Sequence, residues 1–189
     1  MVDKIKILAI SGSFRTNSSN TNILRTITTM APENVEVILY EGLGGLPHFN
    51  PVLDDENSSS AVKELRDLLL SVHGVIVCTP EYAFGVPGSL KNALDWTVSS
   101  GELTNKPVAV ITASLVGEKA HAALLQIFTA LSSSIAEGAT LLIPFIRTKL
   151  NEKGEVSDAD TLQSIQKVLN SLLACIENQL LFPDSIYTK

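Results

Sequence analysis

The sequence of 189 residues has little of what marks several common classes of protein. It contains two cysteines and three histidines, which are scattered without ligand spacing and so argue against a structural metal site. Cys78 and Cys175 lie far apart in apolar surroundings, so we expect buried, reduced thiols rather than a disulfide. No segment approaches the ~20 consecutive apolar residues that cross a bilayer, and we expect no contact with a membrane.

Positive charge is also scarce. The formal net charge is −6, and no Lys- or Arg-rich run is present, so the chain lacks the electrostatic footprint of a nucleic-acid-binding protein. Residues 1–10 have a short apolar run interrupted by lysines and no A-x-A-type cleavage site, so we expect a cytoplasmic protein. With 45% hydrophobic residues the chain can form a full core, and its length suits a single domain over residues 1–189.

Short apolar segments alternate with helical patterns along the whole chain. The expected strands are rich in Val, Ile and Leu and are bounded by Gly, Pro, Ser or Asn: Lys4–Ser11, Val35–Tyr40, Gly74–Pro80, Lys106–Ala113 and Ala139–Pro144. Apolar residues at three- and four-residue steps predict helices between and after them. Strands that are each followed by a helix imply right-handed crossovers. We therefore predict an α/β fold, a flavodoxin-like three-layer sandwich with a five-stranded parallel sheet of order 2-1-3-4-5.

Two connections are long, residues 41–60 and residues 145–157. A loop of more than roughly 12–15 residues in a compact domain is usually functional or mobile. The first of these loops could be a lid or an oligomer contact, and a solvated insertion fits it equally well.

The predicted topology locates a ligand site. In an open parallel sheet, ligands bind beyond the carboxyl ends of the strands where the strand order reverses, here between the first and third strands. The loop after the first strand, residues 11–22, carries Gly12, Arg15 and several Ser, Thr and Asn side chains ahead of a helix expected near residues 22–31. A helix N-terminus favours a phosphate, and Arg15 adds charge-assisted donors. Because G-x-G-x-x-G, P-loop and G-x-S-x-G motifs are all absent, we predict a monophosphate cradle; an N-capped surface turn is the alternative.

The loop after the third strand, residues 79–88, has a different chemistry. Two prolines and two glycines stiffen and turn its backbone, while Tyr82 and Phe84 supply flat apolar area. Such a turn can offer backbone N–H groups to the polar edge of a heterocyclic ring that aromatic side chains flank. The alternative is an ordinary turn whose aromatic residues fill the core.

These loops together resemble the NAD(P)H-dependent FMN reductases, a family that includes chromate, quinone and azo-dye reductases. The likeness follows the chain in order and spacing, through Gly12-Ser13-x-Arg15-x-x-Ser18-x-Asn20, Pro80-Glu81-Tyr82 and Pro87-Gly88-x-Leu90-Lys91-Asn92-Ala93-x-Asp95-Trp96. The resemblance implies an enzyme that passes hydride from NAD(P)H through FMN to a small acceptor, such as a flavin, quinone, azo dye or metal oxyanion. It also implies a homodimer or homotetramer.

The resemblance also implies which residues hold FMN. The phosphate would be surrounded by Ser13, Arg15, Ser18, Asn20 and Thr21. The ring would be lined by Pro80, Glu81, Tyr82, Ala83, Phe84 and Gly85, largely through backbone groups, and approached from the other side by Ser114 through Gly117. Many members carry Asn where this chain has Ala83, so one side-chain hydrogen bond to the flavin is missing here.

No residue is assigned as a catalytic acid, base or nucleophile, because the redox chemistry belongs to the cofactor. Backbone N–H groups near Tyr82 and Gly85 would stabilise negative charge on the reduced ring. Glu81 could donate protons, although a structural carboxylate paired across an oligomer interface is favoured. Two non-catalytic functions remain as alternatives: an electron carrier like flavodoxin, and a flavin-binding regulatory protein. Carriers tend to be markedly acidic, whereas a charge of −6 is mild.

Overall fold

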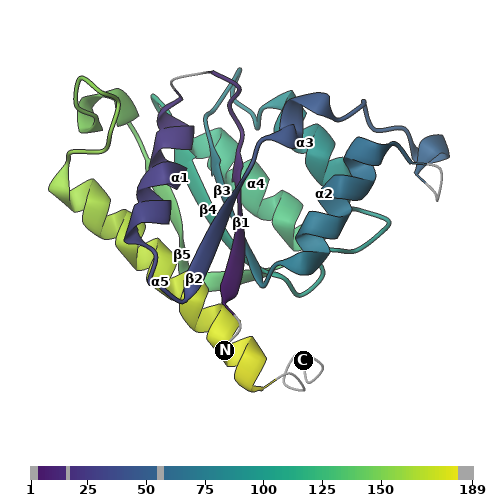
Figure 1. Cartoon of the computed structure of the whole chain (residues 1–189). Coiled ribbons are helices and arrows are strands. Elements are labelled where there is room, and N and C mark those ends of the chain that lie inside the picture. The colour runs from purple at the N-terminus through teal and green to yellow at the C-terminus, as the bar shows by residue number, and fades with distance from the viewer. Residues whose placement is uncertain (1–3, 16–17, 55–57, 183–189) are drawn as a thin grey trace.

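The computed structural model describes residues 4–15, 18–54 and 58–182 (Figure 1). One parallel sheet has the order β2-β1-β3-β4-β5, which confirms the predicted fold class and strand order. Its strands are β1 (Ile5–Ser11), β2 (Val35–Tyr40), β3 (Gly74–Thr79), β4 (Pro107–Ala113) and β5 (Ser134–Ile143). The helices are α1 (Ser19–Met30), α2 (Ser60–Ser71), α3 (Gly88–Asp95), α4 (Glu118–Ala130) and α5 (Ala159–Leu181), with short 3-10 helices η1 (Gly42–Gly45), η2 (Pro51–Leu53) and η3 (Ile146–Lys149).

The helices form a layer on each face of the sheet. Helices α1 and α5 cover one face, and α2, α3 and α4 cover the other (Figure 1). In β1, Ile7 and Ala9 face the first layer, whereas Leu8 and Ile10 face the second. The central strands β3 and β4 are buried along their whole length, as their near-continuous apolar sequences predict. Each fully buried Ile, Leu or Val contributes about 1.5–3 kcal/mol, so the two cores fix the strand ends that carry the site.

The fifth strand is longer than predicted. It begins at Ser134 rather than Ala139, because its first residues pair with β4 before an irregularity in the register between Val108 and Val110. Gly138 lies in this segment with a φ of 77°, a conformation that disfavours residues with a side chain. The polar Glu137 and this glycine interrupt the apolar pattern, which explains why the sequence signal begins only after them.

The first helix also begins earlier than expected. It starts at Ser19, and Ser18 is its N-cap, with a side-chain oxygen that accepts a hydrogen bond from the backbone N–H of Asn20. The phosphate-cradle motif therefore overlaps the first helical turn instead of preceding it. At the last helix, Asp158 is the N-cap and accepts from the N–H of Thr161.

The long loop after β2 packs against α3 and Trp96 through Pro47 and Phe49. Asn92 and Trp96 both donate side-chain hydrogen bonds to the carbonyl of Pro47, at 2.9 Å each. The ring of Phe49 packs edge-on against the buried indole of Trp96, with centroids 5.1 Å apart. The motif segment from Leu90 to Trp96 thus serves helix packing and the attachment of this loop.

Among the described residues, no helix combines the length and apolar character needed to span a bilayer, and no group of His, Cys, Asp and Glu side chains is arranged to hold a metal ion. Both cysteines are free thiols; Cys78 is buried and Cys175 partly exposed.

Candidate functional site

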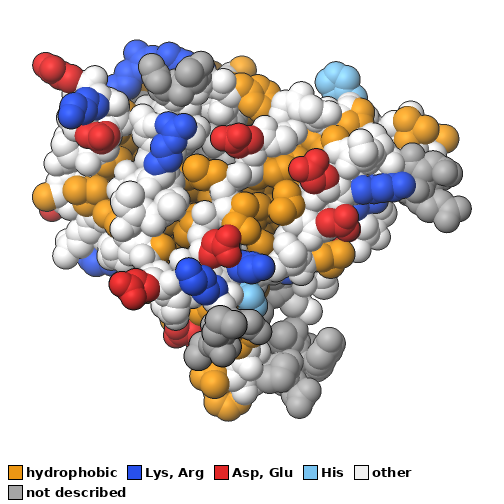
Figure 2. Space-filling view, in the orientation of Figure 1, with side chains coloured by type: hydrophobic (Ala, Val, Ile, Leu, Met, Phe, Trp, Pro, Cys, Tyr) orange, Lys and Arg blue, Asp and Glu red, His pale blue; other side chains and the backbone are white. Residues whose placement is uncertain are grey.

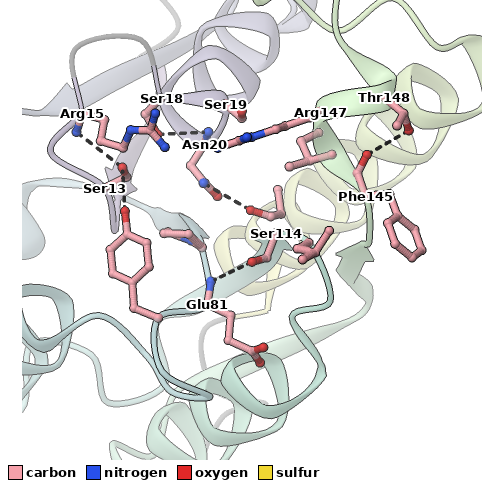
Figure 3. Close-up of a pocket in the computed structure, with 15 residues that line it drawn as sticks. Ser13, Arg15, Ser18, Ser19, Asn20, Glu81, Ser114, Phe145, Arg147 and Thr148 are labelled. Atoms are coloured by element: carbon pink, nitrogen blue, oxygen red, sulfur yellow. Dashed lines mark hydrogen bonds between the residues drawn. The ribbon is translucent and has the colours of Figure 1, made fainter.

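A cavity of about 580 Å³ lies at the carboxyl ends of the strands, where the sequence predicts the ligand site (Figure 3). Loops after β1, β3, β4 and β5 line it. The volume is ordinary for a small-molecule or cofactor site. Of the predicted residues, the cavity brings together Ser13, Arg15, Ser18, Asn20, Pro80, Glu81, Tyr82 and Ser114.

The other predicted residues do not line this cavity; they are Thr21, Ala83, Phe84, Gly85 and Gly117. The hydroxyl of Thr21 lies 2.9 Å from that of Ser11 and braces the loop from behind. Gly117 is the N-cap of α4 with a φ of 96°, and a Cβ there would lie 2.9 Å from Leu142. These two residues shape the loops that surround the site.

Close backbone approach fixes the loop after β1. A Cβ on Gly12 would lie 2.3 Å from the hydroxyl oxygen of Thr79, and the Gly12 N–H donates to the carbonyl of Cys78. Only glycine allows the loop to lie this close to the end of β3. The Ser13 hydroxyl lies 3.5 Å from that of Tyr82 and accepts a hydrogen bond from the N–H of Arg15 (Figure 3). The two predicted loops therefore meet at Ser13.

The side chain of Asn20 is buried and is bonded to two strands. Its amide nitrogen donates to the carbonyl of Ala113 at 3.3 Å, and its oxygen accepts from the thiol of Cys78 at 3.2 Å. Burial raises the pKa of the Cys78 thiol well above its usual range, so the thiol stays protonated and can donate. Asn20 thus holds the N-terminus of α1 against β3 and β4.

The loop after β3 contains a tight two-residue turn. The N–H of Tyr82 donates to the carbonyl of Gly85, and the N–H of Gly85 donates back to the carbonyl of Tyr82. At the centre of the turn, Ala83 and Phe84 have positive φ values of 48° and 61°. Asn tolerates this conformation better than Ala, which gives a backbone reason for the family's Asn at position 83. The turn itself uses the N–H groups of both Tyr82 and Gly85, and the expectation that backbone N–H groups near these residues face a flavin stays a prediction.

Glu81 has its partners within the chain. Its carboxylate accepts hydrogen bonds from the backbone N–H groups of Gly117, at 3.4 Å, and Ala120, at 2.9 Å, in the first turn of α4. Its own N–H donates to the hydroxyl of Ser114 (Figure 3). A carboxylate at a helix N-terminus satisfies unpaired N–H groups and the helix dipole. Glu81 therefore joins the loops after β3 and β4, a role that needs no neighbouring subunit.

Replacement of Glu81 tests this role. Glu81→Ala should lower the free energy of unfolding by about 1 kcal/mol, because two N–H groups lose their acceptor. Glu81→Gln, which keeps an acceptor oxygen, should lose less. Urea denaturation measures both variants, and both should retain the NAD(P)H oxidation that the resemblance implies. Loss of turnover in a folded Glu81→Gln variant would instead support the proton-donor role.

Part of the cavity wall was not predicted from the sequence. The loop after β5 contributes Phe145, Ile146, Arg147 and Thr148, and the wall also includes Ser19 and Ala113. Leu115, which lines the cavity too, lies within the predicted stretch from Ser114 through Gly117. In Figure 3, Arg147 extends from this loop toward the N-terminus of α1. The one available signal was an arginine placed just beyond the carboxyl end of the fifth strand, in a loop already recognised as long.

Comparison with known proteins decides the family. The family of NADPH-dependent FMN reductases matches residues 5–148, which span the four loops that line the cavity. The chain belongs to this family. Membership confirms the resemblance seen in the sequence, and with it the predictions of an oxidoreductase, of FMN as cofactor and of NAD(P)H as co-substrate.

Individual relatives agree with this family. A quinone reductase of Escherichia coli K12 is 30% identical over 172 residues, which cover 87% of this chain and 92% of the relative. An NAD(P)H-dependent FMN reductase of Pseudomonas aeruginosa is 28% identical over 177 residues, covering 91% and 95%. The structure of FerB, a flavoenzyme NAD(P)H:(acceptor) oxidoreductase of Paracoccus denitrificans, matches with a TM-score of 0.74 at 24% identity, over 92% of this chain and 98% of that one. This last likeness shows the fold alone.

Proposed function

We propose that the protein is an FMN-dependent reductase that takes hydride from NAD(P)H and reduces a small acceptor, such as a flavin, quinone, azo dye or metal oxyanion. The observation that carries the proposal is the two-part character of the cavity. One end gathers hydroxyls, arginines and the N-terminus of α1, and the other end is formed by Pro80 and Tyr82. A phosphate suits the first end and a flat heterocycle the second.

The residues fit FMN, which supplies the redox chemistry when bound. Ser13, Arg15 and Ser18 would hold the phosphate together with the N–H groups of the first turn of α1. Pro80 and Tyr82 would line the ring. Because the turn occupies the N–H groups of Tyr82 and Gly85, the polar edge of the ring would bond instead to the N–H groups of Ala83 and Phe84. These two residues do not line the cavity themselves but follow its wall residue Tyr82 in the chain, and their N–H groups have no acceptor among the described residues.

The proposal includes an oligomeric state and a cellular location. We propose a homodimer or homotetramer of single-domain chains, each formed by residues 1–189, that acts in the cytoplasm. Large apolar side chains are exposed on the loops around the cavity: Phe14 at 60%, Phe84 at 79%, Leu115 at 71% and Phe145 at 57%. Figure 2 shows apolar side chains in the middle of one face of the molecule. Exposed apolar groups that gather in this way mark contacts, and gel filtration measures the assembly.

Spectroscopy of the purified protein tests the function. The protein should be yellow, or become so with FMN, and should bleach when NADPH is added without oxygen. With a quinone or ferricyanide as acceptor, initial rates should give parallel double-reciprocal lines, since each substrate meets the flavin in turn. A protein that binds FMN but does not bleach with NADPH would be an electron carrier or a regulator, and intersecting lines would exclude the two-step cycle.

A further inference from the structure

Arg147 lies in the cavity without a partner of its own. Among the described residues, no carboxylate lies within ion-pair distance of its guanidinium, and the same holds for Arg15. Lys149, two residues further on, behaves differently, because its amine lies 3.3 Å from the carboxylate of Asp158, which it pairs with outside this cavity. Arg147 is thus the basic residue of η3 that remains available to a ligand.

The backbone that carries Arg147 is held in place on both sides. Before it, the N–H of Phe145 donates to the carbonyl of Leu115, and the N–H of the buried Ile146 donates to the carbonyl of Ser114. After it, the side chain of Asn22 in α1 donates to the carbonyl of Gly154 at 2.8 Å. The loop is therefore bonded to the loop after β4 and to α1. These bonds hold the backbone from which the Arg147 side chain extends.

Local geometry at Phe145 supports a functional role for this turn. Phe145 has a φ of 52°, a left-handed conformation that is unfavourable for a bulky residue. Such conformations persist where the surroundings impose them, and they cluster at binding sites. The next hydroxyl, that of Thr148, donates to the carbonyl of Phe145 and stabilises the turn. The turn thus directs Arg147 inward (Figure 3).

We propose that Arg147 is a second phosphate ligand, facing Arg15 across the N-terminus of α1, and that the pair makes the site select FMN over unphosphorylated riboflavin. The inference rests on the proposed function. A phosphate monoester carries about −1.5 to −2 charges at pH 7. Arg15 supplies one positive charge and the helix roughly half of one, which leaves up to about half a negative charge of the phosphate uncompensated. Arg147 more than supplies this difference, in a chain whose net charge is −6.

Flavin titrations test the inference without relying on turnover. Apoprotein is titrated with FMN and with riboflavin, and binding is followed by flavin fluorescence. For Arg147→Ala the Kd for FMN should rise roughly 10- to 150-fold, the range for one charge-assisted contact, while the Kd for riboflavin should stay within about twofold. The Kd of Arg147→Lys for FMN should lie between those of Arg147→Ala and the native protein, because lysine keeps the charge but lacks the planar fork of the guanidinium. The salt dependence of FMN binding should also become shallower in Arg147→Ala.

Lys153→Ala is the matched control, since it removes one positive charge from an exposed position of the same loop outside the cavity. It should leave both affinities unchanged. An unchanged ratio of FMN to riboflavin affinity in Arg147→Ala would overturn the inference, whether both affinities hold or both fall together. A variant in which only the KM for NADPH rises would assign Arg147 to the nicotinamide nucleotide instead and would also overturn it. If the native protein binds neither flavin, the proposed function fails first.

Discussion

Replacement of Arg15 by alanine should weaken FMN binding by about 1.5–3 kcal/mol, the range for hydrogen bonds to a charged group, or roughly 10- to 150-fold in Kd. The guanidinium lines the cavity beside the N-terminus of α1, and no carboxylate pairs with it among the described residues. The Arg15 backbone is attached separately, through its N–H to the Ser13 hydroxyl and its carbonyl to the Ser18 N–H. Truncation should therefore remove the charge without releasing the loop.

Calorimetric titration with FMN and riboflavin measures this effect. The Kd for riboflavin should be almost unchanged. Arg25→Ala serves as the control, because Arg25 lies in α1, the helix that follows the Arg15 loop, but bonds to the side chain of Asn22 and does not line the cavity. If Arg15→Ala binds FMN as tightly as the native protein, Arg15 has no place in the site. Arg15 and Arg147 would share one phosphate. The loss of FMN binding free energy in the double variant should therefore differ from the sum of the losses in the two single variants.

The fold could be predicted in detail because its signals are local. Each strand of the sheet carries its own apolar run, and the alternation of strands with helices leaves few topologies. The prediction was wrong where two signals conflict: at the start of β5, Glu137 and Gly138 hide a strand that pairs through an irregular register. At α1, the polar Ser19, Asn20 and Thr21 resemble a loop, yet they form the first helical turn. Residues of this kind favour helix ends and loops alike, so composition cannot separate the two.

The site was predicted only where a motif marks it. The loops after β1 and β3 carry recognisable spacing, and most of their predicted residues reach the cavity. The position of Arg147 depends on contacts between the loops after β4 and β5. These contacts are made through backbone groups of Ser114 and Leu115, which cannot be predicted from residue type. The partners of Glu81 are also backbone N–H groups, 36 and 39 residues away. Sequence patterns identify side chains well, but they carry little information about which backbone groups will meet them.

Asn20 belongs to the recognised motif, but its side chain bonds to groups that the motif does not predict. Asn20→Ala should lower the free energy of unfolding by about 1–3 kcal/mol. The variant leaves the buried carbonyl of Ala113 without its donor and the thiol of Cys78 without its acceptor. Urea denaturation of the apoprotein measures the loss. The resemblance to the family assigns Asn20 to the phosphate, whereas its buried amide bonds indicate that it positions the helix N-terminus which meets that phosphate.

Cys78→Ser is the companion variant, because a hydroxyl can still donate to the Asn20 oxygen. It should lower the free energy of unfolding by less than Asn20→Ala does, and it should leave turnover largely intact. The two readings of Asn20 predict different patterns. If the amide positions α1, Asn20→Ala loses stability even without a ligand, and FMN binding falls as a consequence. If Asn20 were instead a direct phosphate ligand, the apoprotein would keep its stability and only the affinity for FMN would drop. The loss of stability in the absence of flavin thus decides whether the motif's asparagine acts on the cofactor or on the helix that holds it.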